Sequence, residues 1–267
     1  MLAFWPDVLC PVLSELRPQA IVEIGAESGK VTTLLLDLVQ TYGGVVTSID
    51  PAPRFDVALW EREHASTFRF LRMPSLDAIG GLGRLDAVFI DGDHNWYTVY
   101  HELQAIERRA SELRTPTPIV FLHDITWPYG RRDLYYDPAT IPEPYRHAWE
   151  RRGIHPASNA LVERGGINAH LCNATREGGP RNGVLTAVED YLAATTCTFD
   201  FIKIPAVFGL GILVPTHLRL QHASTCAFLR LWSDTRVERF ISRLELARVA
   251  TALPPLPPPD SNGGTEA

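Results

Sequence analysis

The chain has 267 residues, a hydrophobic content of 45% and a formal net charge of −6. This length suits one large α/β domain with insertions, or one domain with a small appendage. The acidic balance argues against charge-driven binding of nucleic acid or an anionic membrane, so we predict neither partner. A poor signal sequence, the absence of a long apolar run and four cysteines without a CxxC pair predict a cytoplasmic protein.

The first half of the chain alternates between strand and helix patterns. Residues 1–19 predict a helical lead-in that prolines interrupt, and the apolar run 20–25 predicts a buried strand. A glycine turn and an amphipathic helix follow, and the next strand, 45–50, ends in Asp50. A helix at 54–65, a strand at 67–73 and a loop at 74–83 follow. The next strand starts at residue 85, and the helix after it spans 95–113.

The strand 118–124 completes a pattern that is typical of a doubly wound parallel sheet. Residues 125–180 interrupt it with a long stretch rich in aromatic residues, which predicts an ordered insertion over the cleft. Two strands at 197–205 and 209–215 are so close in sequence that they must be antiparallel neighbours. A helix at 182–195 precedes them, a C-terminal helix at 217–252 follows, and a Pro-rich tail at 253–267 is predicted to be disordered.

Two of the predicted strands end in acidic and histidine side chains. Asp91 and His94 follow the apolar run that starts at Leu85, and His123 and Asp124 end the run that starts at Ile119. In an open α/β sheet, ligands bind beyond the carboxyl ends of the strands. We therefore expect these four side chains around one cleft, where they could hold a hard metal ion or perform acid/base chemistry.

The turn EIGAESGK, residues 23–30, lies between a strand and a helix and could receive a negative or polar ligand group. It lacks the spacing of a nucleotide P-loop and of the dinucleotide fingerprint. It fits the E-x-G-x-x-x-G turn of S-adenosylmethionine binding, with Glu23, Gly25 and Gly29 in place. Asp50 could then accept both ribose hydroxyls, although NAD sites use the same acid. A structural turn without a ligand is the remaining alternative.

From Ile21 to about Pro215 the chain resembles the class I S-adenosylmethionine-dependent methyltransferases. The stretches FIDGDHNWYTVYHEL and FLHD are similar to the branch of the macrocin and mycinamicin sugar O-methyltransferases and the cephalosporin-hydroxylase-like proteins. The resemblance implies a Rossmann-like seven-stranded sheet with an antiparallel last strand, helices on both faces and a long insertion after strand five, in a domain spanning 20–216. It also implies cofactor contacts from Glu23, Gly25, Ala26, Ser28, Gly29, Asp50, Ser75, Leu76 and Asp91.

The same resemblance implies a catalytic site in which a divalent metal, Mg²⁺ or another, is held by Asp91 and Asp124. His123 stands where relatives often carry a second acid, which could favour a transition metal or mean that no metal binds. His94 would be the general base, acting with Asp91. The alternatives are that His94 is only a satisfied polar residue and that Asp93 caps the following helix.

The insertion contains side chains suited to an acceptor molecule: Trp127, Tyr129, Arg131, Arg132 and Tyr136. The arginines could contact a phosphate or carboxylate, and the aromatic rings could stack on the acceptor. The alternative is a self-packed surface loop or a subunit interface.

These observations predict an O-methyltransferase that acts on a hydroxyl of a small molecule, such as a sugar or another natural-product intermediate. One alternative is metal-independent methylation of a peptide or small-molecule carboxylate or amine, and another is a module that binds S-adenosylmethionine without methyl transfer. A homo-oligomer is expected, with residues 1–18 and 223–250 as candidate contact segments.

Overall fold

The structure, a computed structural model, describes residues 1–164 and 166–253. The predicted disordered tail therefore lies outside the described residues, apart from Leu253. Within the described ranges no helix is both long enough and apolar enough to cross a membrane.

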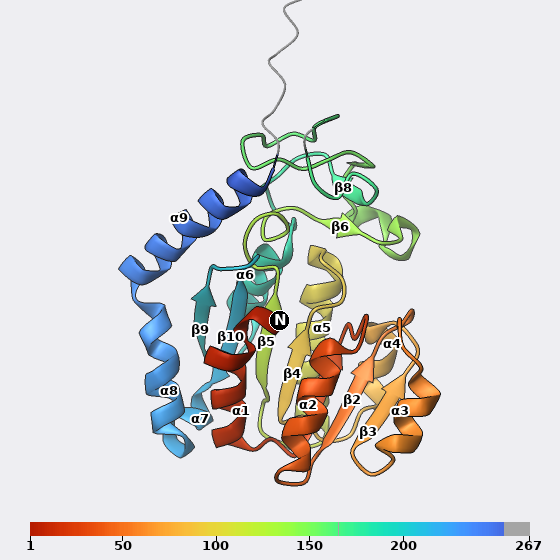
Figure 1. The fold of residues 1–267 in the computed structure, drawn as a ribbon, viewed down its shortest axis with the longest axis vertical. Coiled ribbons are helices and arrows are strands. Elements are labelled where there is room, and N and C mark those ends of the chain that lie inside the picture. Colours follow the sequence, from red (N-terminus) through yellow and green to blue (C-terminus); the bar gives the residue numbers. More distant parts are fainter. Residues whose placement is uncertain (165, 254–267) are drawn as a thin grey trace, which may run out of the picture.

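The centre of the molecule is a seven-stranded sheet with the order β3-β2-β1-β4-β5-β10-β9 (Figure 1). The pairs among β1 to β5 are parallel, and β10 is antiparallel to both of its neighbours, β5 and β9. This is the predicted doubly wound sheet with an antiparallel last strand, which is confirmed. The strands are β1 (Ala20–Ile24), β2 (Val45–Ile49), β3 (Phe68–Leu71), β4 (Ala87–Ile90), β5 (Ile119–His123), β9 (Phe199–Ile204) and β10 (Leu210–Pro215).

The two central strands β4 and β5 are apolar along their length because helices cover both of their faces. All residues of β4 are buried, as are the first four of β5, and this continuous burial is typical of parallel strands. One face packs against the N-terminal helices, α2 and α8 (Ala223–Arg230), and the other packs against α5 and α6. The covering helices are α1 (Cys10–Leu16), α2 (Lys30–Gln40), α3 (Val57–Glu63), α4 (Ser75–Ala78), α5 (Trp96–Glu112) and α6 (Val184–Ala194).

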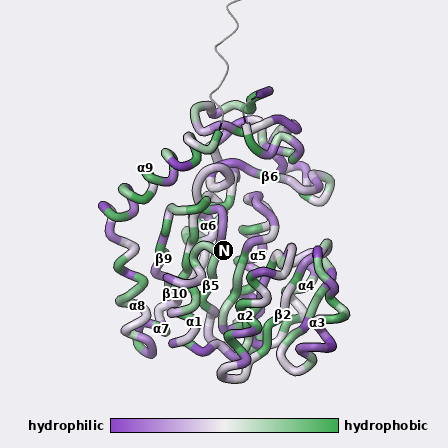
Figure 2. Tube along the Cα trace, viewed as in Figure 1, coloured by the Kyte–Doolittle hydropathy of each residue, from purple (hydrophilic) through white to green (hydrophobic). Residues whose placement is uncertain are grey.

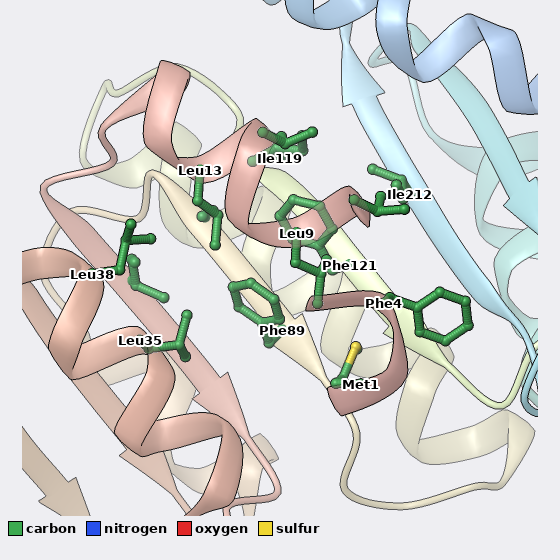
Figure 3. Packing of buried hydrophobic residues seen from close by; sticks show 14 of the residues in the cluster. Met1, Phe4, Leu9, Leu13, Leu35, Leu38, Phe89, Ile119, Phe121 and Ile212 are labelled. Carbon is green, nitrogen blue, oxygen red and sulfur yellow. The ribbon is translucent and has the colours of Figure 1, made fainter. Parts of the chain in front are cut away.

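The N-terminal segment is part of the hydrophobic core. A 3₁₀ turn at Leu2–Phe4, a π-helical turn at Trp5–Leu9 and α1 bring a run of apolar side chains onto the sheet (Figure 3). Leu9 and Leu13 are fully buried there, next to Phe89 of β4 and Phe121 of β5, whose rings stack 4.7 Å apart. The segment therefore covers one face of its own sheet.

The predicted single helix at 217–252 is wrong, because the chain breaks twice within it. The structure has α7 (Thr216–Gln221), α8 (Ala223–Arg230), a 3₁₀ turn at Leu231–Ser233 and α9 (Thr235–Ala252). Asp234 starts a new helix because its carboxylate accepts bonds from the backbone N–H groups of Arg236 and Val237, which is an N-cap. Hydrophilic and hydrophobic residues alternate along α9 (Figure 2).

The insertion forms a small three-stranded sheet with the order β6-β8-β7 above the carboxyl ends of β4 and β5 (Figure 1). Its strands are β6 (Leu134–Tyr135), β7 (Trp149–Glu150) and β8 (Cys172–Ala174), and two 3₁₀ turns lie at Pro138–Thr140 and Glu143–Tyr145. Several of its side chains are fully buried within it, among them Arg132 and Tyr135. The insertion is thus an ordered structure with its own packing.

Because Leu9 is fully buried against the sheet, Leu9→Ala should lower the free energy of unfolding by about 2–5 kcal/mol through the lost contacts and the cavity. Leu2→Ala is the matched control, since Leu2 is 43% exposed, and it should change stability little. Urea denaturation measures both. Equal effects of the two substitutions would show that the N-terminal segment does not pack as described.

Candidate functional site

The site is built at the carboxyl edge of the sheet, where four strands end at the same level. Register aligns the last paired residues of β1, β2, β4 and β5, which are Ile24, Ile49, Ile90 and Leu122. The next residues along each strand therefore emerge side by side, namely Gly25, Asp50, Asp91 and His123. The sheet itself brings the predicted cofactor turn and the predicted acid cluster together.

The glycine turn after β1 depends on close packing against the end of β4. Gly25 has a φ of 88°, and a Cβ there would overlap the carbonyl oxygen of Asp91, so only glycine fits. Asp50 holds the turn by accepting the N–H groups of Ala26 and Glu27 at 3.0 and 2.8 Å through Oδ2. Its Oδ1 accepts one N–H, from Ala52 at 2.7 Å. A carboxylate has about four acceptor positions, so Asp50 retains capacity for a ligand hydroxyl.

Glu23 supports the turn from within β1. It is buried, and its Oε2 accepts hydroxyl bonds from Thr32 of α2 and Ser48 of β2, both at 2.6 Å. Burial raises the pKa of Glu23 to about 7, and the two hydroxyl bonds oppose this rise. Glu23 therefore fixes the position of the turn, while Ala26, Ser28 and Gly29 form the turn itself.

The predicted adenine-side residues Ser75 and Leu76 start α4, a short helix in a stretch that the sequence predicted to be a loop. Ser75 donates its hydroxyl hydrogen to Oε1 of Glu102 on α5 at 2.5 Å. Glu102 is fully buried, its Oε2 has no partner among the described residues, and burial raises its pKa to about 8. Sequence reasoning missed Glu102, although an acid next to Leu103 on the apolar stripe of this helix was a visible signal.

Asp91, His123 and Asp124 form a compact cluster at the ends of β4 and β5. One donor atom from each lies within 4.8 Å of the others, an arrangement that could hold a metal ion. Nδ1 of His123 lies 3.2 Å from Oδ1 of Asp91 and 2.9 Å from Oδ2 of Asp124. Asp124 adopts a left-handed φ of 60°, which aspartate tolerates better than most residues. The ammonium group of Met1 lies 3.4 Å from the second carboxylate oxygen of Asp91.

The orientation of the His123 ring is fixed from outside the cluster. Its Nε2 lies 3.1 Å from the carbonyl oxygen of Val207, which can only accept, so Nε2 carries a hydrogen. Nδ1 therefore faces the two carboxylates, either as a protonated donor or as a metal ligand. Burial disfavours the charged ring, but Asp91 and Asp124 outweigh it and raise the pKa of His123 to about 10.

The donor set fits a divalent cation. Two carboxylate oxygens and one imidazole nitrogen suit Mn²⁺, Fe²⁺ or Zn²⁺ as well as Mg²⁺, and the Val207 carbonyl provides the outer hydrogen bond that metal-binding histidines normally make. Burial opposes ionisation of Asp124, yet His94 and His123 lower its pKa to about 2, so its carboxylate is available as a ligand at neutral pH.

His94 lies between Asp124 and the insertion. Its Nδ1 is 3.4 Å from Oδ2 of Asp124, and its ring stacks on Tyr129 with the centroids 5.6 Å apart and the planes at 9°. Tyr136, which is 57% exposed, has its ring centroid 6.0 Å from that of His94. No residue that the structure describes bonds to Nε2 of His94. The helix that follows is capped by Asn95, whose Oδ1 accepts the N–H of Thr98, so the alternative cap role for Asp93 is not observed.

The structure separates the five residues that the sequence assigned to the acceptor. Tyr136 alone lies exposed beside His94, and Trp127 and Arg131 line a different cavity of about 210 Å³ between the insertion, β9 and α9. The prediction for Arg132 is wrong: its side chain is fully buried and donates to the carbonyls of Ala174 and Asn159. Tyr129 is 4% exposed and covers His94, so its ring face is not open to an acceptor.

Residues 22–125 match the family model of a methyltransferase domain. None of the curated proteins compared with the chain matches it. Among solved structures, the chain is similar to the S-adenosylhomocysteine-bound methyltransferase PaMTH1 of Podospora anserina (13% identity, 76% of this chain and 74% of that chain, TM-score 0.47). It is also similar to the 1,6-didemethyltoxoflavin-N1-methyltransferase of Burkholderia thailandensis (16% identity, 79% of each chain, TM-score 0.43).

The matched segment runs from β1 through β5 and includes both the glycine turn and the acid cluster. Over these residues the chain thus matches a methyltransferase domain, and the glycine turn beside Asp50 is the feature of this segment that suits S-adenosylmethionine.

The buried Glu102 gives a pH dependence of stability. Its folded pKa of about 8 lies above the value of 4.5 for an unperturbed glutamate, so the folded state binds more protons between these values. Stability contributed by this group should therefore fall as pH rises from about 5 to about 8, by roughly 1.4 kcal/mol per pH unit. Glu102→Gln should flatten this part of the curve, measured by urea denaturation at several pH values. An unchanged slope in the variant would contradict the assignment.

Proposed function

We propose that the protein transfers the methyl group of S-adenosylmethionine to a hydroxyl oxygen of a small molecule. The observation that carries this proposal is the placement of His94, whose Nδ1 faces Asp124 and whose Nε2 has no described partner, beside the Asp91–His123–Asp124 cluster. This histidine lies at the same sheet edge as the glycine turn, so a base and a methyl donor would share one cleft.

The cofactor would lie over the turn after β1. Asp50, whose Oδ1 has acceptor capacity left, would accept the ribose hydroxyls, and Ser75 with Leu76 would lie near the adenine. When bound, S-adenosylmethionine supplies an electrophilic methyl group on a positively charged sulfur. The carboxylates of Asp50 and Asp91 at this edge favour a positively charged ligand.

Asp91, His123 and Asp124 would hold a divalent cation, Mg²⁺ or a transition metal. When bound, such a cation would lower the pKa of the acceptor hydroxyl and orient it. His123 would take part as a neutral ligand through Nδ1, because its Nε2 hydrogen is committed to Val207.

His94 would remove the proton of the acceptor hydroxyl. Nδ1 of His94 lies 3.4 Å from Oδ2 of Asp124, so a hydrogen on Nδ1 would face the carboxylate and Nε2 would be the nitrogen that accepts the proton. The carboxylate of Asp124 would also stabilise the imidazolium that forms. As the oxygen–carbon bond forms and the sulfur–carbon bond breaks, the proton remains on His94.

The acceptor would be a hydroxylated molecule small enough to fit between the sheet edge and the insertion. Tyr136 of the insertion is the exposed aromatic ring beside His94, and it could stack on the acceptor. The resemblance to the macrocin and mycinamicin branch favours a sugar or another natural-product intermediate. Trp127 and Arg131 would reach only a part of the acceptor that extends into their cavity.

Metal-independent methylation of a carboxylate or amine is a second candidate, and one observation favours it. Without a metal, a protonated His123 satisfies both Asp91 and Asp124, so the cluster is also a complete ion-pair network. Methyl transfer to a carboxylate needs neither a metal nor a strong base. Chelation of the metal distinguishes the two candidates.

His94→Gln should reduce the rate of methyl transfer by about 10²- to 10⁴-fold, because glutamine cannot accept the proton. The measurement is transfer of labelled methyl groups from S-adenosylmethionine to a panel of phenols and sugars. The affinity for S-adenosylhomocysteine should stay unchanged, because His94 is not one of the residues that would contact the cofactor. A variant that retains the full rate would rule out His94 as the base.

Mg²⁺ and Mn²⁺ should bind the wild-type protein, and Asp124→Asn should abolish this binding because a neutral amide replaces a ligand carboxylate. Isothermal titration measures the binding directly. Asp93→Asn is the matched control, since Asp93 bonds to Thr98 and is not part of the cluster; it should bind the cations like the wild type. Full methyl transfer after exhaustive chelation would reject the metal and favour the second candidate.

A further inference from the structure

The insertion contacts His94 along two independent routes. The first route is through the ring, which stacks on Tyr129 with the planes at 9°. The hydroxyl of Tyr129 accepts a bond from Nδ2 of Asn168 at 2.7 Å and donates to Oδ1 of Asn173 at 3.2 Å. Both asparagines belong to the insertion, so it fixes the phenol ring at its far end.

The second route is through the backbone and centres on Asp133, a fully buried carboxylate that follows Arg132. Its Oδ1 accepts the N–H groups of Trp96, at the start of α5, and of Gly183, just before α6, at 2.7 and 2.6 Å. Its Oδ2 accepts the hydroxyl hydrogen of Tyr135 at 2.8 Å. One side chain thus joins the beginnings of two helices.

This carboxylate also determines where the His94 backbone lies. Trp96 is two residues after His94, and the next residue after Asp133, Leu134, donates its N–H to the carbonyl oxygen of His94 at 3.0 Å. The contact with α6 is tight as well, since a Cβ on Gly183 would lie 2.5 Å from the backbone nitrogen of Arg132. The backbone of His94 is therefore held between α5 and the insertion.

We propose that Tyr129 and Asp133 are positioning residues for His94. Tyr129 sets the plane of the imidazole, and Asp133 sets the backbone position from which it extends, so that Nδ1 faces Asp124. This inference rests on the proposed function, in which His94 removes the proton of the acceptor. It assigns to the insertion a part in building the base, in addition to covering the cleft.

The test compares Tyr129→Phe, which keeps the ring, with Tyr129→Leu, which removes it. The NMR signals of the His94 ring protons can be assigned in histidine-labelled protein, because they disappear in His94→Gln. The stacked phenol ring should shift these signals away from the values of an unstacked histidine. Tyr129→Phe, which keeps the ring but loses the hydroxyl bonds to Asn168 and Asn173, should reduce this NMR shift, and Tyr129→Leu should abolish it. In the methyl-transfer assay, Tyr129→Leu should reduce kcat by about 10- to 100-fold, because a small misplacement of a catalytic group is costly. The affinity for S-adenosylhomocysteine should stay constant.

Asn168→Ala provides a second variant if Tyr129→Leu does not fold. Asn168 is half-buried and donates to the Tyr129 hydroxyl, so its loss should free the ring without emptying a core. It should shift the His94 signals in the same direction as Tyr129→Leu, with a smaller loss of kcat. Asp133→Asn, which keeps an acceptor oxygen for the N–H groups of Trp96 and Gly183, should rescue most of the activity that Asp133→Ala loses.

The outcomes separate this inference from the function on which it rests. Suppose that His94→Gln is inactive, but Tyr129→Leu folds and keeps the wild-type kcat and NMR shifts. The positioning role of Tyr129 is then overturned, while the role of His94 as the base is retained. If His94→Gln is as active as the wild type, the proposed base fails and the positioning role in catalysis fails with it.

Discussion

The carboxylate of Asp124 is the interaction on which the rest of the site depends. Its Oδ2 lies 2.9 Å from Nδ1 of His123 and 3.4 Å from Nδ1 of His94, so one oxygen faces both imidazoles. His123 is turned toward the cluster because its Nε2 is bound to Val207. Nε2 of His94 has no partner among the described residues. Asp124 directly follows the last residue of β5 and has a left-handed φ of 60°.

The sheet and the insertion contribute different parts of the site. Parallel register brings the glycine turn, Asp50 and Asp91 to one level, which needs no information beyond the alignment of four strands. The insertion adds what the sheet edge lacks, because Tyr129 and Asp133 hold His94 from the opposite side. Buried polar groups such as Asp133 are costly unless all their bonds are made, and here three donors satisfy one carboxylate. These bonds explain why a long connection in a compact domain is ordered.

The sequence predicted the fold well because its signals are local and repeated. Apolar runs ending in acid, a glycine turn and helical periodicity located the strands, the turn and the antiparallel pair β9–β10. It predicted the C-terminal helix poorly, because one of the two breaks, the one before α9, depends on a single N-cap at Asp234. In the insertion, residue type did not indicate which side chains face the site. Arg132 and Tyr136 were both assigned to the acceptor, but Arg132 is buried and Tyr136 is exposed. Contacts between distant segments, such as Ser75 with Glu102, are not readable from spacing.

A crystal of the protein soaked with S-adenosylhomocysteine and Mn²⁺, with anomalous scattering used to locate the metal, tests the shared site most directly. The cofactor product should lie on the glycine turn with its ribose on Asp50, and an anomalous peak should lie between Asp91, His123 and Asp124. Cofactor product bound at another place, or no binding at all, would contradict the shared cleft. Bound product without an anomalous peak would contradict the proposed metal site but not the proposed role of His94 as the base.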